Sequence, residues 1–101
     1  MYAARVVGTV VCTQKDPGMN AYKMQIVQPV NLVTFQDEGK PAVAIDAVGA
    51  GTDEIVLVVA GSSARLTQFT NNKPVDLAIT AIVDFIDIEG KRVFDKHKKE
   101  V

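Results

Sequence analysis

Residues 46–65 read DAVGAGTDEIVLVVAGSSAR, and this stretch decides the fold that we predict. An apolar run from Ile55 to Ala60 lies between two turns that hold every glycine and every charge of the stretch. A strand that is apolar at each position needs cover on both of its faces. A chain of 101 residues is one domain by length, and its core is small. We therefore expect neighbouring copies of the chain to supply part of this cover.

The bulk composition favours a β protein and excludes several classes. Hydrophobic residues make up 48% of the chain, mostly Val, Ala, Ile and Leu, and there is no Trp. Eleven basic and twelve acidic residues leave a net charge of -1, so no overall positive field attracts a polyanion. Cys12 is the single cysteine, which fits a reducing compartment. We find neither a signal peptide nor an apolar run near the ~20 residues of a membrane span, and we expect a cytosolic protein.

Short β-branched segments separated by Gly, Pro and Asp turns predict a mainly β fold, namely a small, five-stranded, OB-like barrel with one short helix. The charged tail from Lys91 is expected to fray, which gives a barrel domain over 1–90 and a tail over 91–101. The helix is expected over 62–67, because Gly61 frees the backbone and a serine caps the first turn. The expected strands cover 2–13, 22–30, 41–48, 54–60 and 76–88.

More apolar strand positions are present than one barrel interior can use. Val7 and Val11, one parity of residues 55–59, and Ala78, Ile82 and Ile86 remain after the core is filled. An exposed apolar area above a few hundred Å² usually marks an interface. We therefore predict an oligomer. A fully covered sandwich core, or the short helix lying over one sheet, is the alternative.

The candidates for catalysis and metal binding are weak. His97 lies among lysines without an orienting partner, and Cys12 alternates with Val10 as a small core residue would. Asp46, Asp53 and Glu54 could act as acid and base, but carboxylates beside turns more often cap backbone N–H groups or pair with Arg across an interface. No Gly-Lys-Ser/Thr follows the glycines, as a phosphate loop requires.

An OB-like barrel also raises the possibility of binding to nucleic acid. Single-strand binders combine a basic groove with aromatic stacking platforms. The aromatic residues here are scattered, and the strands carry little positive charge. An OB-type nucleic-acid or small-ligand module is therefore the second hypothesis, and a small enzyme built on the three carboxylates is the third.

The chain resembles the EutN/CcmL family of pentameric vertex proteins of bacterial microcompartment shells. The resemblance spans nearly the whole chain, and the order of the matching blocks makes it specific. One departure concerns Asp53, which stands where the family usually has Gly before the glutamate. The matching blocks are Gly8–Lys15, Lys23–Met24, Val27–Pro29, Asp46–Glu54, Gly61–Arg65, Pro74–Asp76 and Ile82–Asp84.

This resemblance implies a β-barrel protomer and a cyclic homopentamer that caps the corners of a polyhedral shell otherwise tiled by hexameric shell proteins. It implies a structural protein of the bacterial cytoplasm, without catalysis, cofactor, nucleic acid or membrane. Arg65 is expected to pair with Glu54 or Asp84 of a neighbour. Turn geometry and the family match together predict subunit-contact or loop-shaping roles for Gly49, Gly51, Glu54, Ser62, Ser63, Arg65 and Asp84.

Overall fold

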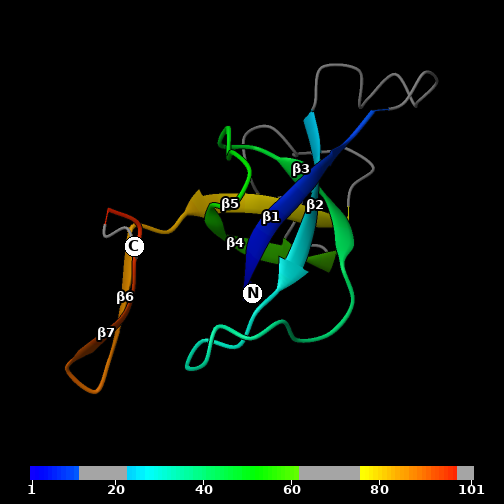
Figure 1. Cartoon of the computed structure of the whole chain (residues 1–101). Helices are drawn as coiled ribbons and strands as arrows, with labels where there is room; N and C mark the ends of the chain where they lie inside the picture. The colour runs from blue at the N-terminus through cyan, green and yellow to red at the C-terminus, as the bar shows by residue number, and fades with distance from the viewer. Residues whose placement is uncertain (12–22, 62–75, 98–101) are drawn as a thin grey trace.

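The computed structural model describes residues 1–11, 23–61 and 76–97, and the chain in these ranges is built of β-strands (Figure 1). Five strands close into a barrel in the order β1-β2-β3-β5-β4, and β6 and β7 form a separate two-stranded sheet. Among the strands of the described residues, only the β3–β5 pair is parallel. The predicted five-stranded barrel is thus confirmed, while the helix expected over 62–67 lies outside the described residues. The strands are β1 (Tyr2–Val10), β2 (Lys23–Pro29), β3 (Ala42–Asp46), β4 (Ile55–Ala60), β5 (Leu77–Ile82), β6 (Phe85–Ile88) and β7 (Lys91–Asp95).

The C-terminal part differs from the expectation in two ways. The single strand predicted over 76–88 is wrong, because the chain leaves the barrel after Ile82 and starts β6 at Phe85. The prediction of a fraying tail is wrong for 91–95, which form β7. Glu89 and Gly90 both have positive φ, 51° and 78°, as a tight hairpin turn requires, and this turn folds β7 back onto β6.

The barrel interior is filled by small and β-branched side chains. Each strand turns alternate residues inward, so the fully buried set has a period of two. The small volume of the alanines lets five strands close around a narrow interior. The cluster comprises Ala4, Val6, Val27, Ala44, Ala50, Val56, Val58 and Ile79.

The outer faces of the barrel are only partly covered by the chain itself. Val7 and Val11 are 41% and 88% exposed, which confirms that they are surplus to the core. Ala78 and Ile82 were predicted to be surplus as well, and this is wrong, because Ala78 is 0% exposed and Ile82 packs against the interior cluster. The outward residues of β4 are also covered: Val59 packs with Met24, Ile45 and Ala78, and Ile55 with Ala3, Val30 and Phe94.

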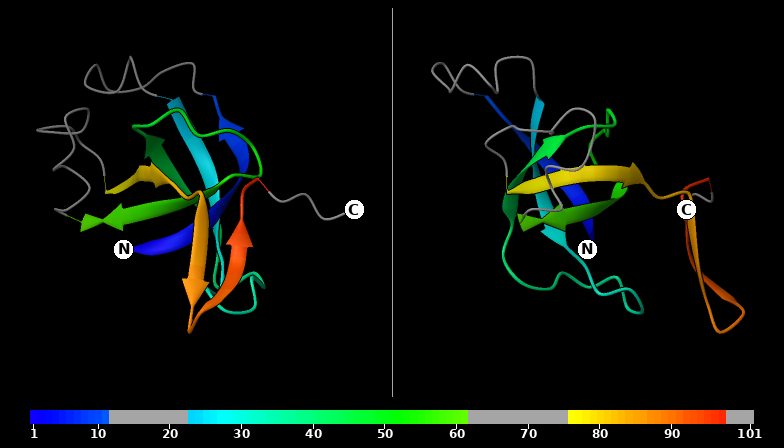
Figure 2. Two further views of the ribbon diagram at one scale, coloured as in Figure 1. Left: turned by 90° about the vertical axis from the view of Figure 1, so that its left-hand side faces the viewer. Right: turned by 180° about the vertical axis from the view of Figure 1, so that it is seen from behind.

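The β6–β7 hairpin stands off from the barrel, as the right-hand view of Figure 2 shows. The molecule measures 44 × 25 × 24 Å, and the hairpin extends away from the closed sheet. Its base is fixed where the amide of Val83 donates to the carbonyl of Ile55 at 2.8 Å. At the same end of the barrel, the ring of Phe94 packs 5.5 Å from the ring of Phe35. The hairpin is therefore anchored at one end and free of the barrel at the other.

Candidate functional site

The glycine loop between β3 and β4 is organised by the carboxylate of Asp46. Its Oδ1 accepts the amides of Val48 at 3.0 Å and Gly49 at 2.9 Å. Its Oδ2 accepts the amide of Ala50 at 2.8 Å and Nε2 of Gln25 at 3.2 Å. Asp46 is only 9% exposed. With four donors around it, this carboxylate stabilises the loop and has no lone pair directed at a substrate.

Gln25 connects the loop to the barrel, and it is not among the site residues predicted from the sequence. Its side chain is 1% exposed and donates from Nε2 to the carbonyl of Ala50 at 2.8 Å. Its Oε1 accepts the hydroxyl of Thr9 at 2.9 Å. Gln25 is two residues from Val27 on β2, so both point inward. The sequence did carry one indication of this contact, because a polar residue at an inward position of a strand must have a buried hydrogen-bond partner.

Backbone conformation explains why glycine and aspartate occupy this loop. Gly49 has φ of 77° and Asp53 has φ of 70°, in the left-handed region. Apart from Gly, Asp is among the few residues that adopt positive φ readily. Asp53 can therefore occupy a position at which the family usually has Gly. The amide of Asp53 donates to the carbonyl of Val6 at 2.8 Å. A Cβ on Gly51 would lie 3.3 Å from Oε1 of Glu54, so a larger residue there would have to displace the end of that side chain slightly.

Glu54 joins the glycine loop to the base of the hairpin. Its Oε1 accepts the amide of Gly51 at 2.6 Å, and its Oε2 lies 2.9 Å from Nζ of Lys96. The hydrogen bond from Lys96, together with that from Gly51, lowers the pKa of Glu54 despite its partial burial. The same contact raises the pKa of Lys96. Lys96, which the sequence analysis placed in a frayed tail, thus belongs to this site.

The structure brings four of the predicted site residues into one region. Gly49, Gly51 and Glu54 share the glycine loop, while the carbonyl of exposed Asp84 accepts the amide of Lys96 at 2.7 Å. Lys96 therefore contacts both acidic residues. The other three predicted residues, Ser62, Ser63 and Arg65, lie outside the described residues, so their predicted subunit contacts stay predictions.

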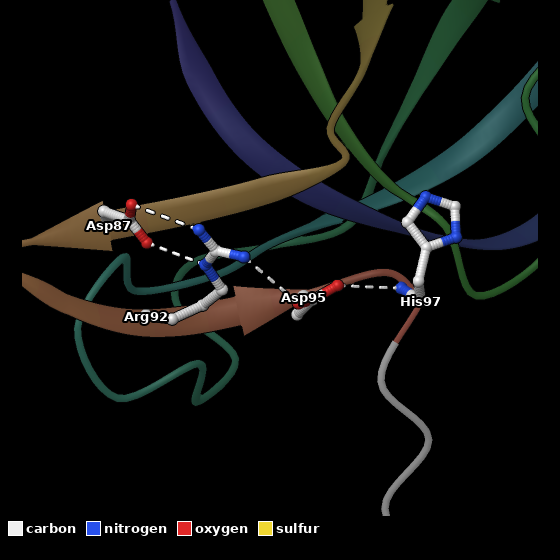
Figure 3. A network of polar contacts seen from close by, with 4 residues as sticks. All are labelled: Asp87, Arg92, Asp95 and His97. Atoms are coloured by element: carbon white, nitrogen blue, oxygen red, sulfur yellow. Dashed lines mark hydrogen bonds and ion pairs between the residues drawn. The ribbon is translucent and has the colours of Figure 1, made fainter.

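A second polar network lies on the hairpin (Figure 3). Nε of Arg92 donates to Oδ1 of Asp87 at 2.9 Å, Nη1 lies 3.4 Å from Asp95, and the guanidinium covers the ring of Phe85 at 4.0 Å. The pKa of Arg92 is raised, chiefly by Asp87. His97 donates its backbone amide to Asp95 at 3.0 Å, which is the main cause of the lowered pKa of that carboxyl. The contacts of Arg92 with Asp87 and Phe85 join the two strands of the hairpin, whereas those of Asp95 lie within β7 and the turn that follows it.

The described part of the chain contains no arrangement suited to metal chemistry. In residues 1–11, 23–61 and 76–97, no three His, Cys, Asp or Glu side chains come close enough to hold an ion. Of the three carboxylates considered for acid–base work, Asp46 and Glu54 are committed to backbone and lysine donors. Within the same ranges, no helix is long and apolar enough to span a bilayer. The site therefore consists of loop geometry and ion pairs.

The sequence also matches a known family over most of its length. Residues 1–84 match the family model described as "Ethanolamine utilisation protein EutN/carboxysome", and the match ends just before β6. The chain belongs to the EutN/CcmL family. The resemblance seen in the sequence blocks is thereby confirmed.

Individual members of the EutN/CcmL family are similar over nearly the whole chain. The bacterial microcompartment shell vertex protein EutN of Salmonella typhimurium is 44% identical over 95% of this chain and 96% of its own length. The structure of CcmL from Gloeobacter violaceus superposes with a TM-score of 0.91 at 36% identity, covering 97% of this chain and all of CcmL. GrpN of Rhodospirillum rubrum, a pentameric microcompartment shell protein, has a TM-score of 0.78 and 38% identity over 87% of this chain and 99% of GrpN.

Proposed function

We propose that this chain is a structural protein of a bacterial microcompartment shell, and that five copies form a ring that caps a vertex of the polyhedral shell in the bacterial cytoplasm. The observation that carries the proposal is similarity to shell vertex proteins over nearly the full length, together with the shared barrel. The pentameric state of GrpN supports the number of copies. Fivefold rings fit the vertices of a shell whose flat faces are hexameric tiles, which makes hexameric shell proteins the expected partners.

The exposed apolar residues of the barrel support self-assembly. Val7, Val11 and Val43 are 41%, 88% and 47% exposed on a chain of only 101 residues. Ile26 lies between Val7 and Val43 on the outer face of the barrel, and an apolar surface that continues across strands favours burial against another protein. A ring of identical subunits is produced when one heterologous contact repeats and its rotation closes.

A structural role without catalysis agrees with the chemistry of the glycine loop. The carboxylate of Asp46 satisfies four N–H donors, and that of Glu54 satisfies Gly51 and Lys96. We propose that the loop presents a fixed surface to the neighbouring subunit, with Asp84 exposed beside it and available to Arg65 of that neighbour. Glu54 is the less favoured partner of Arg65, since Lys96 already occupies it.

Native mass spectrometry of the purified protein at micromolar concentration tests the proposal. We expect a species of five times the 10.9 kDa chain mass, with ring-shaped particles in electron micrographs. A monomer that persists at tens of micromolar would contradict it. Binding of single-stranded DNA at low salt would instead favour the alternative of a nucleic-acid module, because such binding weakens strongly as salt rises.

A further inference from the structure

The β6–β7 hairpin, which we call the hairpin arm (Phe85–Asp95), contacts its own barrel only near the base. There the amide of Val83 donates to the carbonyl of Ile55 at 2.8 Å, and Nζ of Lys96 lies 2.9 Å from Oε2 of Glu54. The Phe94 ring packs 5.5 Å from the Phe35 ring. The turn at the far end points away from the barrel in Figure 1 and in the right-hand view of Figure 2. An isolated two-stranded hairpin is marginally stable in water. The arm therefore requires support beyond what its base provides.

The two faces of the hairpin arm differ in chemistry. Cross-strand pairing of Asp87 with Arg92 places the charged network of Figure 3 on one face. Pairing of Ile86 with Phe94 places these two residues, together with Ile88, on the other face. Phe94 packs against the barrel, whereas Ile86 and Ile88 belong to none of the core clusters of the described residues. Ile86 and Ile88 are half-buried, so part of this apolar face remains open to contact, while Phe85 on the opposite face lies under the guanidinium of Arg92.

A matching apolar surface lies on another side of the barrel. Val7, Ile26 and Val43 lie across the outer faces of β1, β2 and β3, and we call them the valine stripe. Ile26 is paired with both Gly8 and Val43, so the stripe crosses adjacent strands. The base of the arm lies beside the start of β4, whereas Ile26 and Val43 lie on β2 and β3, the two barrel strands that do not pair with β4. Val7 lies on β1, beyond the residues Tyr2–Arg5 that pair with β4. One chain therefore carries two apolar surfaces that face different directions.

We propose that the apolar face of the hairpin arm of one subunit packs on the valine stripe of the next subunit around the ring. This inference rests on the proposed function, because it requires a closed ring. A heterologous ring contact needs two different surfaces on each chain, and the arm and the stripe are such a pair. Each copy then gives one arm and receives one, so both apolar surfaces are covered in every subunit. The Asp87–Arg92 face of the arm stays toward water, where a charged network costs little.

Two charge substitutions test the pairing. Ile88→Asp alters the arm, and Val43→Asp alters the stripe at a residue that is 47% exposed. Each variant alone is expected to lose the ring and run as a monomer in native mass spectrometry, because a carboxylate would be buried in the contact. Val33→Asp, at a loop residue that is 64% exposed, is the matched control and is expected to keep the ring. Circular dichroism checks that each variant keeps the β spectrum of the wild type.

Mixing the two variants gives the sharpest result. Ile88→Asp retains an intact stripe and Val43→Asp retains an intact arm, so an equal mixture is expected to form dimers of twice the chain mass and nothing larger. Two monomeric variants that do not combine would overturn the inference. Rings that survive both substitutions would overturn it as well, while leaving the proposed function standing. A monomeric wild type would instead remove the proposed function itself. If Ile88→Asp does not fold, Ile88→Thr replaces it and is expected to raise the concentration for half-dissociation at least tenfold.

Discussion

Replacing Asp46 with Ala should destabilise the protein more than any other single change in the glycine loop. The substitution removes the acceptor of four N–H groups. Two of these donors belong to buried residues, namely the amide of Ala50 and the N–H of Gln25 Nε2 that does not bond to the carbonyl of Ala50. A buried donor left without a partner costs about 1–3 kcal/mol, so the pair predicts a loss of about 2–6 kcal/mol, and we expect about 4 kcal/mol. The donors of Val48 and Gly49 lie nearer the surface, where water can replace the carboxylate.

Urea unfolding measures this loss directly. With a denaturant dependence of about 2 kcal/mol per molar urea, the midpoint should fall by about 2 M. Because assembly adds to apparent stability, wild type and variants are compared at one protein concentration and with native mass spectra of each. Asp46→Asn keeps one oxygen, which can turn to the buried donors, and should lose about half as much. Asp53→Asn, on the exposed side of the same loop, should change stability by less than about 0.5 kcal/mol. An Asp46→Ala variant within 1 kcal/mol of wild type would refute the assignment of the carboxylate as the organiser of the loop.

Three further predictions follow from the same region. Asp53→Gly should stabilise the chain by up to about 1 kcal/mol in a thermal melt, because residue 53 has φ of 70°. Asp53→Val should destabilise the chain, and a valine variant more stable than the glycine variant would argue against backbone strain at this position. Gly49→Ala should cost about 1–2 kcal/mol for backbone reasons alone, because no atom lies within 4 Å of the new Cβ, and an unchanged melting temperature would contradict this. The Glu54–Lys96 pair should stabilise the fold at pH values above the unfolded pKa of Glu54, near 4.5, and this stabilisation should be lost as pH falls through the lowered folded pKa. Glu54→Gln should therefore reduce the loss of stability between neutral and acid pH, and an unchanged loss would exclude the pair. The raised pKa of Lys96 extends the contribution of the pair until pH rises above the ordinary lysine value of 10.5.

The strands of the barrel could be predicted from the sequence because their patterns are local. β-branched alternation and glycine or proline turns located four of them within a few residues of their observed ends and also the start of the fifth, β5. The positive φ of Asp53 was also foreseeable, because Asp stands at a position where the family usually has Gly. Local patterns of this kind depend only on backbone sterics and side-chain direction.

The hairpin arm could not be predicted in the same way. Residues 76–88 alternate as one continuous strand would, and nothing local marks the departure from the barrel at Val83. The break depends on a hydrogen bond from Val83 to Ile55, a residue far away in the chain. For the same reason Lys96 was taken as part of a frayed tail, although its ammonium group meets Glu54 across the fold.

The sequence by itself determined that this protein is a small β-barrel with more apolar surface than one chain can bury. The counts of valine, isoleucine and alanine at alternating positions suffice for that conclusion, because burial is roughly proportional to apolar area. The tertiary structure decided which of those faces the chain covers itself. Ala78 and Ile55 are buried by non-local neighbours, and Val7 and Val43 are not. Such pairing depends on strand register and on where the hairpin arm folds, and both are set by contacts between residues far apart in the sequence.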